Sequence, residues 1–412
     1  MPGERRVVIT GLGVFASTGK NADTFFGNLL QARSAVRRIS QWDPSSLSVQ
    51  IAAEVADYNP IDYFPRKRLD LLDRFTQFGL LAAREALAAS GIQFTEEERP
   101  RFGVVMGTGL GGAVTFDNSY HSLYAKGETR LPPFTIPKAM YNAVTAQISM
   151  EFGAQGPALA VSTACSSSTH AIGEAFHMIK YGTADIILAG GSDAPITYGT
   201  LRSWESVRVL APGNGDPSRA CRPFSADREG MVIGEGAAVL LLEEYEHARR
   251  RGAQIYAELT GYGMSSDAGH ITQPSVMGPA RAIRMALDEA GVNPEEVDYI
   301  NAHGTGTRLN DVIETQVIKE VFKSHARHVA ISSTKSMHGH AMGATGALEL
   351  TAAAMAIGHE AMPPTANYAQ PDPECDLDYV PNQAREQTVH VAMSNSFAFG
   401  GLNAVLLVRR LD

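Results

Sequence analysis

The chain has 412 residues, of which 44% are hydrophobic and 19% are charged, and its formal net charge is −9 at pH 7. This length and composition allow a large buried core, and the absence of a long basic run argues against nucleic acid as the main partner. The three cysteines, Cys165, Cys221 and Cys375, lack metal-binding spacing and are odd in number. We therefore expect neither a zinc site nor a disulfide framework.

Two segments could act as targeting or membrane signals, and neither has the required pattern. The strand-like run Val7 to Ile9 follows the N-terminus so closely that no room is left for a signal peptide. The apolar stretch Ala341 to Gly358 is interrupted by Glu349 and is rich in Ala and Gly, which suits a buried helix better than a membrane span. We expect a soluble, cytoplasmic protein without membrane insertion.

The two halves of the chain repeat the same series of elements. Four matches occur in the same order: residues 8–13 with 258–263; 85–92 and the strand 102–106 with 285–292 and the strand 297–301; the strand, turn and helix around Cys165 with those beginning at Ala330; and 236–241 with 402–407. Buried Val, Ile and Ala strands alternate with amphipathic helices, which is typical of packed α/β units. We predict two α/β halves, 1–254 and 255–412, in one compact unit.

A glycine-rich run in the first half, Gly107-Thr108-Gly109-Leu110-Gly111-Gly112, follows a predicted strand and matches the G-x-G-x-x-G pattern of dinucleotide-binding loops. The residues after it, Ala113 to Asn118, are a poor start for a helix, and no acidic residue ends a following strand. We therefore reject a nucleotide and expect no cofactor.

Cys165 lies in the run Ala160-Val161-Ser162-Thr163-Ala164-Cys165-Ser166-Ser167-Ser168-Thr169-His170. A buried strand is predicted to end at Thr163 and a helix to span Thr169 to Lys180, so small residues form a sharp turn between them. The sulfur then lies near a helix N-terminus, whose partial positive charge and free N–H groups stabilise a thiolate. This position favours a nucleophile, while a buried structural cysteine is the alternative that this segment alone leaves open.

Two loops of the second half carry further reactive side chains. One strand ends in Asn301-Ala302-His303-Gly304-Thr305-Gly306-Thr307, which places an imidazole on a glycine-rich loop. The following run, Ser333-Thr334-Lys335-Ser336-Met337-His338-Gly339-His340, carries a lysine and another imidazole where the repeat places Cys165. If an approximate two-fold axis relates the halves, these loops converge with the Cys165 loop at the carboxyl ends of the strands.

A thiol, two imidazoles and an ammonium group without an obvious acidic partner restrict the reaction. A thiol protease needs one histidine oriented by Asn or Asp as the general base. Two histidines that both donate hydrogen bonds suit a developing enolate or oxyanion better. The final loop, Ser394-Asn395-Ser396-Phe397-Ala398-Phe399-Gly400-Gly401, can offer backbone N–H groups to an acyl-enzyme oxyanion, although it also serves as the turn before the last strand.

Four of these segments together resemble the motifs of the β-ketoacyl-acyl carrier protein synthases, most closely synthase II, in the thiolase superfamily. They are Thr163-Ala164-Cys165-Ser166-Ser167, His303 to Thr307, Lys335 to His340 and Phe397 to Gly401. The resemblance covers essentially the whole chain. It implies a five-layer αβαβα thiolase-like fold, a homodimer, and decarboxylative Claisen condensation with malonyl-acyl carrier protein in fatty-acid elongation. A ketosynthase of a specialised lipid, polyene or polyketide pathway, or a heterodimer subunit of such a system, is the alternative.

The resemblance also implies catalytic roles. Cys165 would accept the acyl chain as a thioester, and His303 and His340 would bind the malonyl thioester carbonyl and stabilise the enolate formed as carbon dioxide leaves. Lys335 would act electrostatically and structurally. The N–H groups of Cys165 and Phe399 would form the oxyanion hole, and the Phe399 side chain would act as a gate for the second substrate.

Further positions would bind substrate or an ion. Thr305 and Thr307 would hydrogen-bond the pantetheine arm, Phe397 and Gly400 would contact substrate in the gate loop, and Leu110 would limit acyl chain length. The resemblance also implies a monovalent cation site, seen in some relatives, formed by Asn301, Glu349, Ser394 and Asn395.

Three residues depart from the usual pattern of these synthases. Ala398 replaces a glycine between the two phenylalanines, Leu402 stands where threonine is common, and His338 holds a position often occupied by threonine. Ala398 would stiffen the gate loop if that position required a positive φ, because a Cβ there costs roughly 1 kcal/mol. These changes leave the chemistry intact but weaken the case for housekeeping chain elongation.

The expected partner, an acidic acyl carrier protein, needs a local basic patch on this net-negative enzyme. Arg66, Lys67, Arg68 and Arg74, at the start of an amphipathic helix, are the first candidates, with Arg208 second. A solvated helix start without a partner is the alternative interpretation.

Two rival functions remain. A degradative thiolase uses a second cysteine as base, but Cys221 and Cys375 lie outside the motif loops. A non-catalytic partner subunit that sets product length would lack the nucleophile, whereas this chain keeps Cys165, His303, Lys335 and His340.

Overall fold

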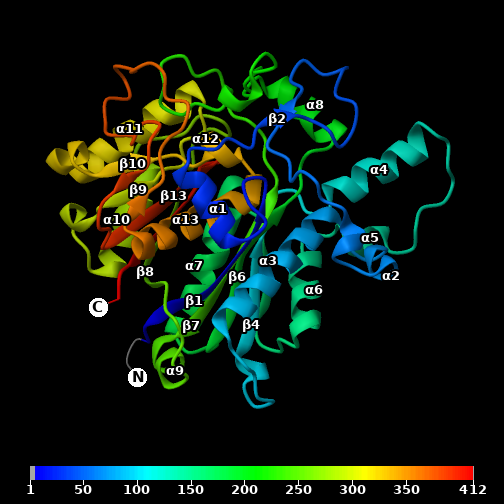
Figure 1. Cartoon of the computed structure of the whole chain (residues 1–412), viewed down its shortest axis with the longest axis horizontal. Helices are drawn as coiled ribbons and strands as arrows, with labels where there is room; N and C mark the ends of the chain where they lie inside the picture. The colour runs from blue at the N-terminus through cyan, green and yellow to red at the C-terminus, as the bar shows by residue number, and fades with distance from the viewer. Residues whose placement is uncertain (1–4, 412) are drawn as a thin grey trace.

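The computed structural model describes residues 5–411 (Figure 1). Met1 to Glu4, part of the segment considered for a signal peptide, lie outside the described residues. The largest element is a ten-stranded sheet in the order β10-β9-β13-β14-β8-β1-β7-β6-β4-β5. Its first-half strands are β1 (Val7–Ala16), β4 (Phe102–Gly107), β5 (Ala158–Val161), β6 (Ile186–Asp193) and β7 (Gly236–Glu244). Its second-half strands are β8 (Ala257–Ser266), β9 (Tyr299–Asn301), β10 (Ala330–Ser332), β13 (Val391–Ala398) and β14 (Leu402–Arg409).

Strand order shows that the chain is duplicated. The halves meet where β1 and β8 pair antiparallel over three residues each. Outward from this junction the order is β1-β7-β6-β4-β5 in one half and β8-β14-β13-β9-β10 in the other. In both, the second strand is antiparallel to its neighbours, and the outer three strands are parallel. All four predicted matches therefore fall on equivalent strands, while the boundary at residue 254 stays a prediction.

The two five-stranded halves of this sheet form two separate layers on either side of central helices, so the layers follow the order helix, sheet, helix, sheet, helix, as the resemblance implied. The middle layer consists of α7 (Ser167–Lys180) and α13 (Thr345–His359), which contact strands of both halves (Figure 1). The outer layers consist of α3 (Arg74–Ser90) and α6 (Ala143–Phe152) on one side and α10 (Met277–Ala290) and α11 (Arg308–Phe322) on the other.

Matching glycines allow α3 and α10 to approach the sheet equally closely. A Cβ on Gly13 of β1 would lie 1.9 Å from the carbonyl oxygen of Ala82, and a Cβ on Gly263 of β8 would lie 1.9 Å from that of Ala282. A side chain at either position would therefore displace the helix backbone. The repeated glycines noted in the sequence thus have the same packing role in both halves.

The remaining elements are short or peripheral. They are α1 (Ala22–Leu30), α2 (Arg66–Leu69), α4 (Ala113–Tyr124), α5 (Thr135–Ala139), α8 (Tyr198–Val207), α9 (Tyr245–Arg250), α12 (Lys335–His338), β2 (Arg37–Arg38), β3 (Ile51–Ala52), β11 (Ala361–Met362) and β12 (Arg385–Glu386), besides short 3₁₀ turns. Figure 1 shows α4 and α5 projecting beside the body of the molecule. Across residues 5–411, no helix has the length and apolar character needed to cross a membrane.

Candidate active site

Cys165 occupies a strained turn between β5 and α7. The strand ends at Val161, two residues earlier than predicted, and the 3₁₀ turn η3 (Ala164–Ser166) leads directly into α7. Ala164 has a φ of +53°, a left-handed conformation that costs a residue with a Cβ about 1–2 kcal/mol. The Thr163 N–H donates to Ser167 Oγ at 2.9 Å and helps to hold the turn.

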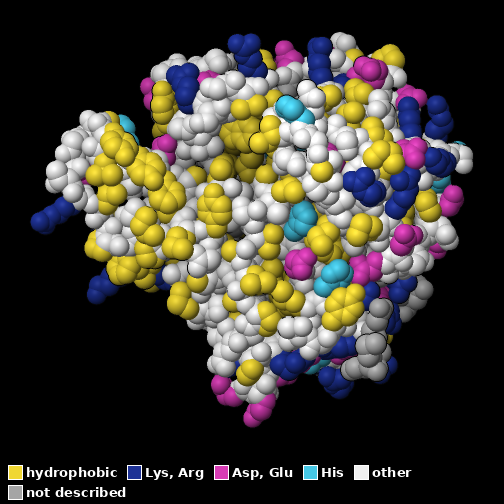
Figure 2. Space-filling view, turned by 180° about the vertical axis from the view of Figure 1, so that it is seen from behind, with side chains coloured by type: hydrophobic (Ala, Val, Ile, Leu, Met, Phe, Trp, Pro, Cys, Tyr) yellow, Lys and Arg dark blue, Asp and Glu magenta, His cyan; other side chains and the backbone are white. Residues whose placement is uncertain are grey.

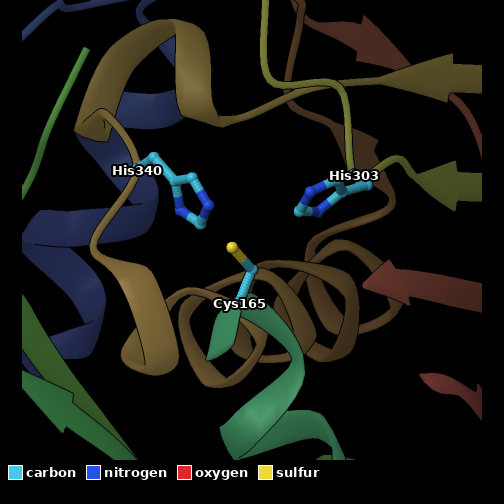
Figure 3. Close-up of side chains that lie close together, drawn as sticks. All are labelled: Cys165, His303 and His340. Carbon is cyan, nitrogen blue, oxygen red and sulfur yellow. The ribbon is translucent and has the colours of Figure 1, made fainter. Parts of the chain in front are cut away.

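The two histidines meet Cys165 from the other half of the molecule. His303 follows β9 and His340 follows α12, and Figure 3 shows the sulfur pointing between the two rings. The sulfur and one ring nitrogen of each histidine lie within 4.8 Å of one another. The ring centroids are 5.7 Å apart with an interplanar angle of 85°. The fold therefore brings together three reactive side chains that lie far apart in the sequence.

Each imidazole is neutral and carries a single proton. Burial, followed by the positive charge of Lys335, lowers the pKa of His303 and of His340 well below the ordinary value. Lys335 Nζ can only donate and lies 3.4 Å from His303 Nδ1, so the His303 proton belongs on Nε2. His340 Nδ1 lies 2.9 Å from Thr345 Oγ1, whereas its Nε2 is buried without a partner among the described residues.

Lys335 is fully buried and holds the backbone of His303. Its Nζ donates to the carbonyl oxygen of His303 at 2.5 Å and forms an ion pair with Glu349, which is also fully buried. Burial raises the pKa of Glu349 above its ordinary value, and the Lys335 charge acts in the opposite direction. Lys335 therefore couples a buried carboxylate to the position of a histidine that faces Cys165.

The thiol of Cys165 is less acidic than its place near a helix N-terminus suggested. Burial raises the pKa of Cys165 to about 11, although the Lys335 charge and the backbone N–H groups of Phe399 and Cys165 act in the opposite direction. Desolvation of the charged form outweighs these favourable contacts. The expectation of a stabilised thiolate in the free enzyme is therefore wrong, but the two N–H groups do point toward the sulfur.

A cavity of about 220 Å³ opens beside the three side chains. Thr305, Thr307, Phe397 and Phe399 are among its walls, as predicted from the motifs, whereas Gly400 and Lys335 are not. The cavity is also lined by Trp204, whose ring lies 5.9 Å from that of Phe399, and by the segment 270–274, none of which was predicted from the sequence. Trp204 is one of only two tryptophans in the chain, but nothing in its local sequence marks it as a cavity residue.

Leu110 lies behind the cavity wall, in an apolar cluster that also includes Trp204 and Met231. Contrary to expectation, the glycine-rich run does lead into a helix, α4, and an acidic residue does end a later strand, Asp193 of β6. The Asp193 carboxylate accepts hydrogen bonds from the N–H groups of Gly109 and Leu110 at 2.7 and 3.1 Å. These donors are therefore already used by a carboxylate and are not free for a phosphate.

Three of the predicted cation ligands have side-chain oxygens without a hydrogen-bond partner. Glu349 Oε2, Ser394 Oγ and Asn395 Oδ1 are three of the eight buried side-chain polar atoms without a partner in residues 5–411. Asn301 and Ser394 occupy paired positions on β9 and β13. Oxygen atoms from a carboxylate, a hydroxyl and an amide are ligands that hard cations prefer, so this donor set fits a small metal ion.

One residue near these ligands was missed. Glu314 of α11 accepts hydrogen bonds from the N–H groups of His303 and Gly304 at 2.8 and 2.7 Å and from Asn395 Nδ2 at 3.3 Å. Burial raises the pKa of Glu314 to about 7. No motif identifies it, because it lies within an ordinary amphipathic helix and acts only through the fold.

The predicted basic patch is only partly available. Arg66, Lys67 and Arg208 are exposed, while Arg68 pairs with Glu151. Arg74 must be removed from the patch, because its side chain turns inward and pairs with the buried Glu235 at 2.6 Å.

Ala398, one of the departures from the usual pattern, does not stiffen the gate loop through a positive φ. Ala398 belongs to β13, pairs with Leu402 of β14 and has no positive φ. The turn is made by Gly400 and Gly401, with φ values of +84° and +70°. The Ala398 side chain therefore adds no backbone strain to the gate loop.

A duplicated five-layer α/β fold with a cysteine and two histidines at the strand ends defines an acyl-transferring condensing enzyme. The family model described as beta-ketoacyl synthase, N-terminal domain, matches residues 4–248, and the corresponding C-terminal domain model matches residues 256–369. The chain belongs to the β-ketoacyl synthase family.

Full-length relatives carry two kinds of name. The chain is 47% identical over 408 residues to nodulation protein E of Rhizobium sp. (strain N33), covering 99% of this chain and 100% of that one. It is 42% identical over 414 residues to 3-oxoacyl-[acyl-carrier-protein] synthase 2 of Staphylococcus aureus (strain COL), covering 100% of both.

Solved structures agree with the fold. The ishigamide ketosynthase/chain length factor matches with a TM-score of 0.92 and 36% identity over 100% of both chains. A type II polyketide acyl-carrier protein in complex with its ketosynthase matches with a TM-score of 0.91 and 35% identity, covering 99% of this chain and 100% of that one.

Proposed function

We propose that this chain condenses an acyl group held on Cys165 with a malonyl group on an acyl carrier protein, giving a 3-oxoacyl carrier protein and carbon dioxide. The observation that carries the proposal is the cluster of one sulfur and two imidazole nitrogens within 4.8 Å beside a cavity. The cavity rim includes the exposed side chains of Ile271 and Leu309, so a substrate arm can enter from the surface.

The first half-reaction loads the enzyme. The Cys165 sulfur attacks the acyl thioester carbonyl, the carbonyl oxygen gains negative charge, and the carrier thiol leaves with the proton that Cys165 gives up. The N–H groups of Cys165 and Phe399, which already point toward the sulfur, are suited to stabilising that oxygen. The product is a thioester on Cys165.

The second half-reaction uses the two imidazoles. With their protons on Nε2, His303 and His340 donate to the malonyl thioester oxygen and stabilise the enolate that forms when the carboxylate leaves as carbon dioxide. In that tautomer His340 Nδ1 has no proton and accepts from the Thr345 hydroxyl, which lies 2.9 Å away. The enolate carbon attacks the acyl carbonyl, a C–C bond forms, and the bond to the Cys165 sulfur breaks, after which the released thiolate takes up a proton from water.

Carbon dioxide release and covalent labelling test this function directly. Purified protein is incubated with an acyl donor and malonyl-carrier protein, intact mass is measured for acylation of Cys165, and released carbon dioxide is counted. We expect both events. Absence of both would favour the non-catalytic partner subunit.

Fatty-acid elongation and a specialised pathway are both compatible with this chemistry. The relative named 3-oxoacyl-[acyl-carrier-protein] synthase 2 supports the first, and the relatives named nodulation protein E and the polyketide ketosynthases support the second. We propose elongation, with a specialised lipid or polyketide-like product as the alternative. Rates on a panel of acyl-carrier thioesters of different length and unsaturation distinguish them. A cytoplasmic location stays a prediction.

We also propose that a monovalent cation binds beside Lys335, held by Asn301, Glu349, Ser394 and Asn395. With both carboxyls ionised around a bound cation, Glu349 and Glu314 would carry two negative charges against the one positive charge of Lys335, so a single positive charge would balance this buried group. The three unpartnered oxygens support the same assignment. A divalent ion would leave one uncompensated charge in the core, which is costly.

Reversing charge on α2 should weaken use of the carrier protein. Arg66 and Lys67 are exposed, so their replacement by glutamate repels an acidic partner without disturbing the core. We expect Arg66→Glu with Lys67→Glu to raise KM for acyl-carrier protein roughly threefold to tenfold and to leave KM for a small thioester unchanged. The matched control reverses the charges of Arg249 and Arg250 on α9, which follows β7 at the end of the strands opposite to the active site. Equal effects on both substrates would refute the patch.

We propose a homodimer in which the β5 edges of two copies meet. The edge strand β5 is exposed, whereas the other edge, β10, is buried, and the Ile331 N–H of β10 donates to the Asp378 carbonyl at 2.9 Å. Apolar side chains near β5 are exposed, including Met150 and Leu159, and Figure 2 shows hydrophobic side chains gathered on the projecting part of the molecule. A bare apolar edge of this kind invites pairing with another chain.

A lysine in that edge should separate the subunits. We expect Leu159→Lys, at a side chain that is 44% exposed, to raise the dimer dissociation constant at least about tenfold. Light scattering should then shift from twice the chain mass of 44.1 kDa toward one chain. The control is Met285→Lys on α10, where the side chain is 48% exposed. A wild-type monomer that gains activity only with a second protein would favour a heterodimer instead.

A further inference from the structure

His338, one of the three departures from the usual synthase pattern, is buried at the end of α12 with both ring nitrogens hydrogen-bonded. Nδ1 lies 2.7 Å from the carbonyl oxygen of Gly339, and Nε2 lies 3.0 Å from Thr334 Oγ1. No step of the condensation uses this ring. Its two hydrogen bonds instead connect it to the backbone of Gly339 and to the Thr334 side chain.

The two contacts of His338 fix where each proton lies. A carbonyl oxygen can only accept, so Nδ1 carries the ring proton and donates to Gly339. Burial and the Lys335 charge lower the pKa of His338 to about 3, so the ring is neutral and Nε2 has no proton. Nε2 must then accept, and the single hydroxyl proton of Thr334 is directed to it.

This assignment determines whether the Thr334 hydroxyl donates a hydrogen bond to the Asn301 side chain or accepts one from it. Thr334 Oγ1 lies 3.3 Å from Asn301 Nδ2 and 3.4 Å from Asn301 Oδ1. Because its proton is already given to His338, Thr334 can accept from Nδ2 but cannot donate to Oδ1. Asn301 Nδ2 also donates to the carbonyl oxygen of Glu349 at 3.4 Å. Both hydrogens of the amide are therefore used, and its oxygen is left without a donor.

We propose that His338 is a positioning residue that acts through Thr334 to keep the Asn301 side-chain oxygen free as a ligand for the monovalent cation. The inference rests on the cation site proposed above. It adds a fourth oxygen to the three that are already unpartnered, Glu349 Oε2, Ser394 Oγ and Asn395 Oδ1. With threonine at position 338, the Thr334 hydroxyl could turn and donate to Asn301 Oδ1, in competition with the ion.

Thermal unfolding in potassium chloride tests the inference without relying on activity. The unfolding midpoint is measured as potassium replaces tetramethylammonium at constant ionic strength, which gives an apparent potassium dissociation constant for each variant. We expect the midpoint of the wild type to rise with potassium. His338→Thr should weaken potassium binding by about tenfold, the usual size of one hydrogen-bond-strength contact to a charge.

Two further variants separate positioning from general damage to the core. His338→Gln offers one donor and one acceptor, so it should keep potassium affinity within about threefold of wild type. Thr334→Val removes the hydroxyl through which His338 acts, so adding His338→Thr to it should change the affinity no further. Because each variant is compared with itself in tetramethylammonium, a lower midpoint without potassium does not affect the result.

Equal potassium affinity in wild type and His338→Thr would overturn the inference and leave the cation site standing. So would additive effects of Thr334→Val and His338→Thr. A wild type that gains nothing from potassium or sodium would overturn both the inference and the cation site. The condensation itself is judged separately by carbon dioxide release and by acylation of Cys165.

Discussion

Cys165→Ala is expected to abolish condensation while decarboxylation of malonyl-carrier protein continues. The sulfur forms the acyl thioester, and without it no electrophile is available to the enolate, so condensation should fall by roughly 10⁴-fold or more. Enolate formation depends on His303 and His340, whose rings keep their partners Lys335 and Thr345 in the variant. Carbon dioxide release and 3-oxoacyl product are measured in the same reaction.

The matched variant is His340→Ala, which should lower both readings by about 10²- to 10³-fold, because it removes one of the two hydrogen-bond donors for the enolate. In the wild type, Nε2 of His340 is buried without a hydrogen-bond partner, so it can donate to the substrate without breaking a hydrogen bond within the protein. Loss of decarboxylation in Cys165→Ala together with its retention in His340→Ala would reverse the assigned roles of sulfur and imidazole.

The duplicated fold could be predicted from the sequence because its signals are local and repeated. The glycines around Gly13 recur around Gly263, and each permits the same close approach of a helix. The buried strands read as apolar runs in both halves, so their equivalence did not depend on knowing how they pair. Loops at strand ends then had to gather at one edge, which placed Cys165, His303 and His340 together.

Other features depend on balances that only the assembled structure determines. The position of Cys165 near the N-terminus of α7 suggested a more acidic thiol. Its burial outweighs that effect, and the extent of burial cannot be predicted from the neighbouring residues in the sequence. Arg74 was predicted to belong to the exposed basic patch at the start of an amphipathic helix, yet its side chain pairs with the buried Glu235. Asp193 and Glu314 act on loops that are distant in sequence, and Ala164 gives no sign of its positive φ.

The ion pair between Lys335 and Glu349 has the largest expected effect on stability. Neither side chain is exposed, so removing one partner leaves a charge buried without its counterion. We expect Lys335→Met to lower the free energy of unfolding by about 3–5 kcal/mol, whereas Lys335→Met with Glu349→Leu should recover most of that loss, since an apolar pair of similar volume replaces the ions. Urea denaturation at fixed protein concentration measures both.

The same two variants separate folding from catalysis. Lys335 Nζ holds the His303 carbonyl and directs the His303 proton to Nε2, so both variants should lose condensation activity by at least about 10²-fold even where the double variant is stable. Without the Lys335 charge, the pKa of His303 should rise, although burial, the larger cause, still holds it below its ordinary value. A stable double variant with wild-type activity would show that Lys335 serves only to neutralise Glu349, and that His303 is held by Glu314 and the backbone of β9 alone.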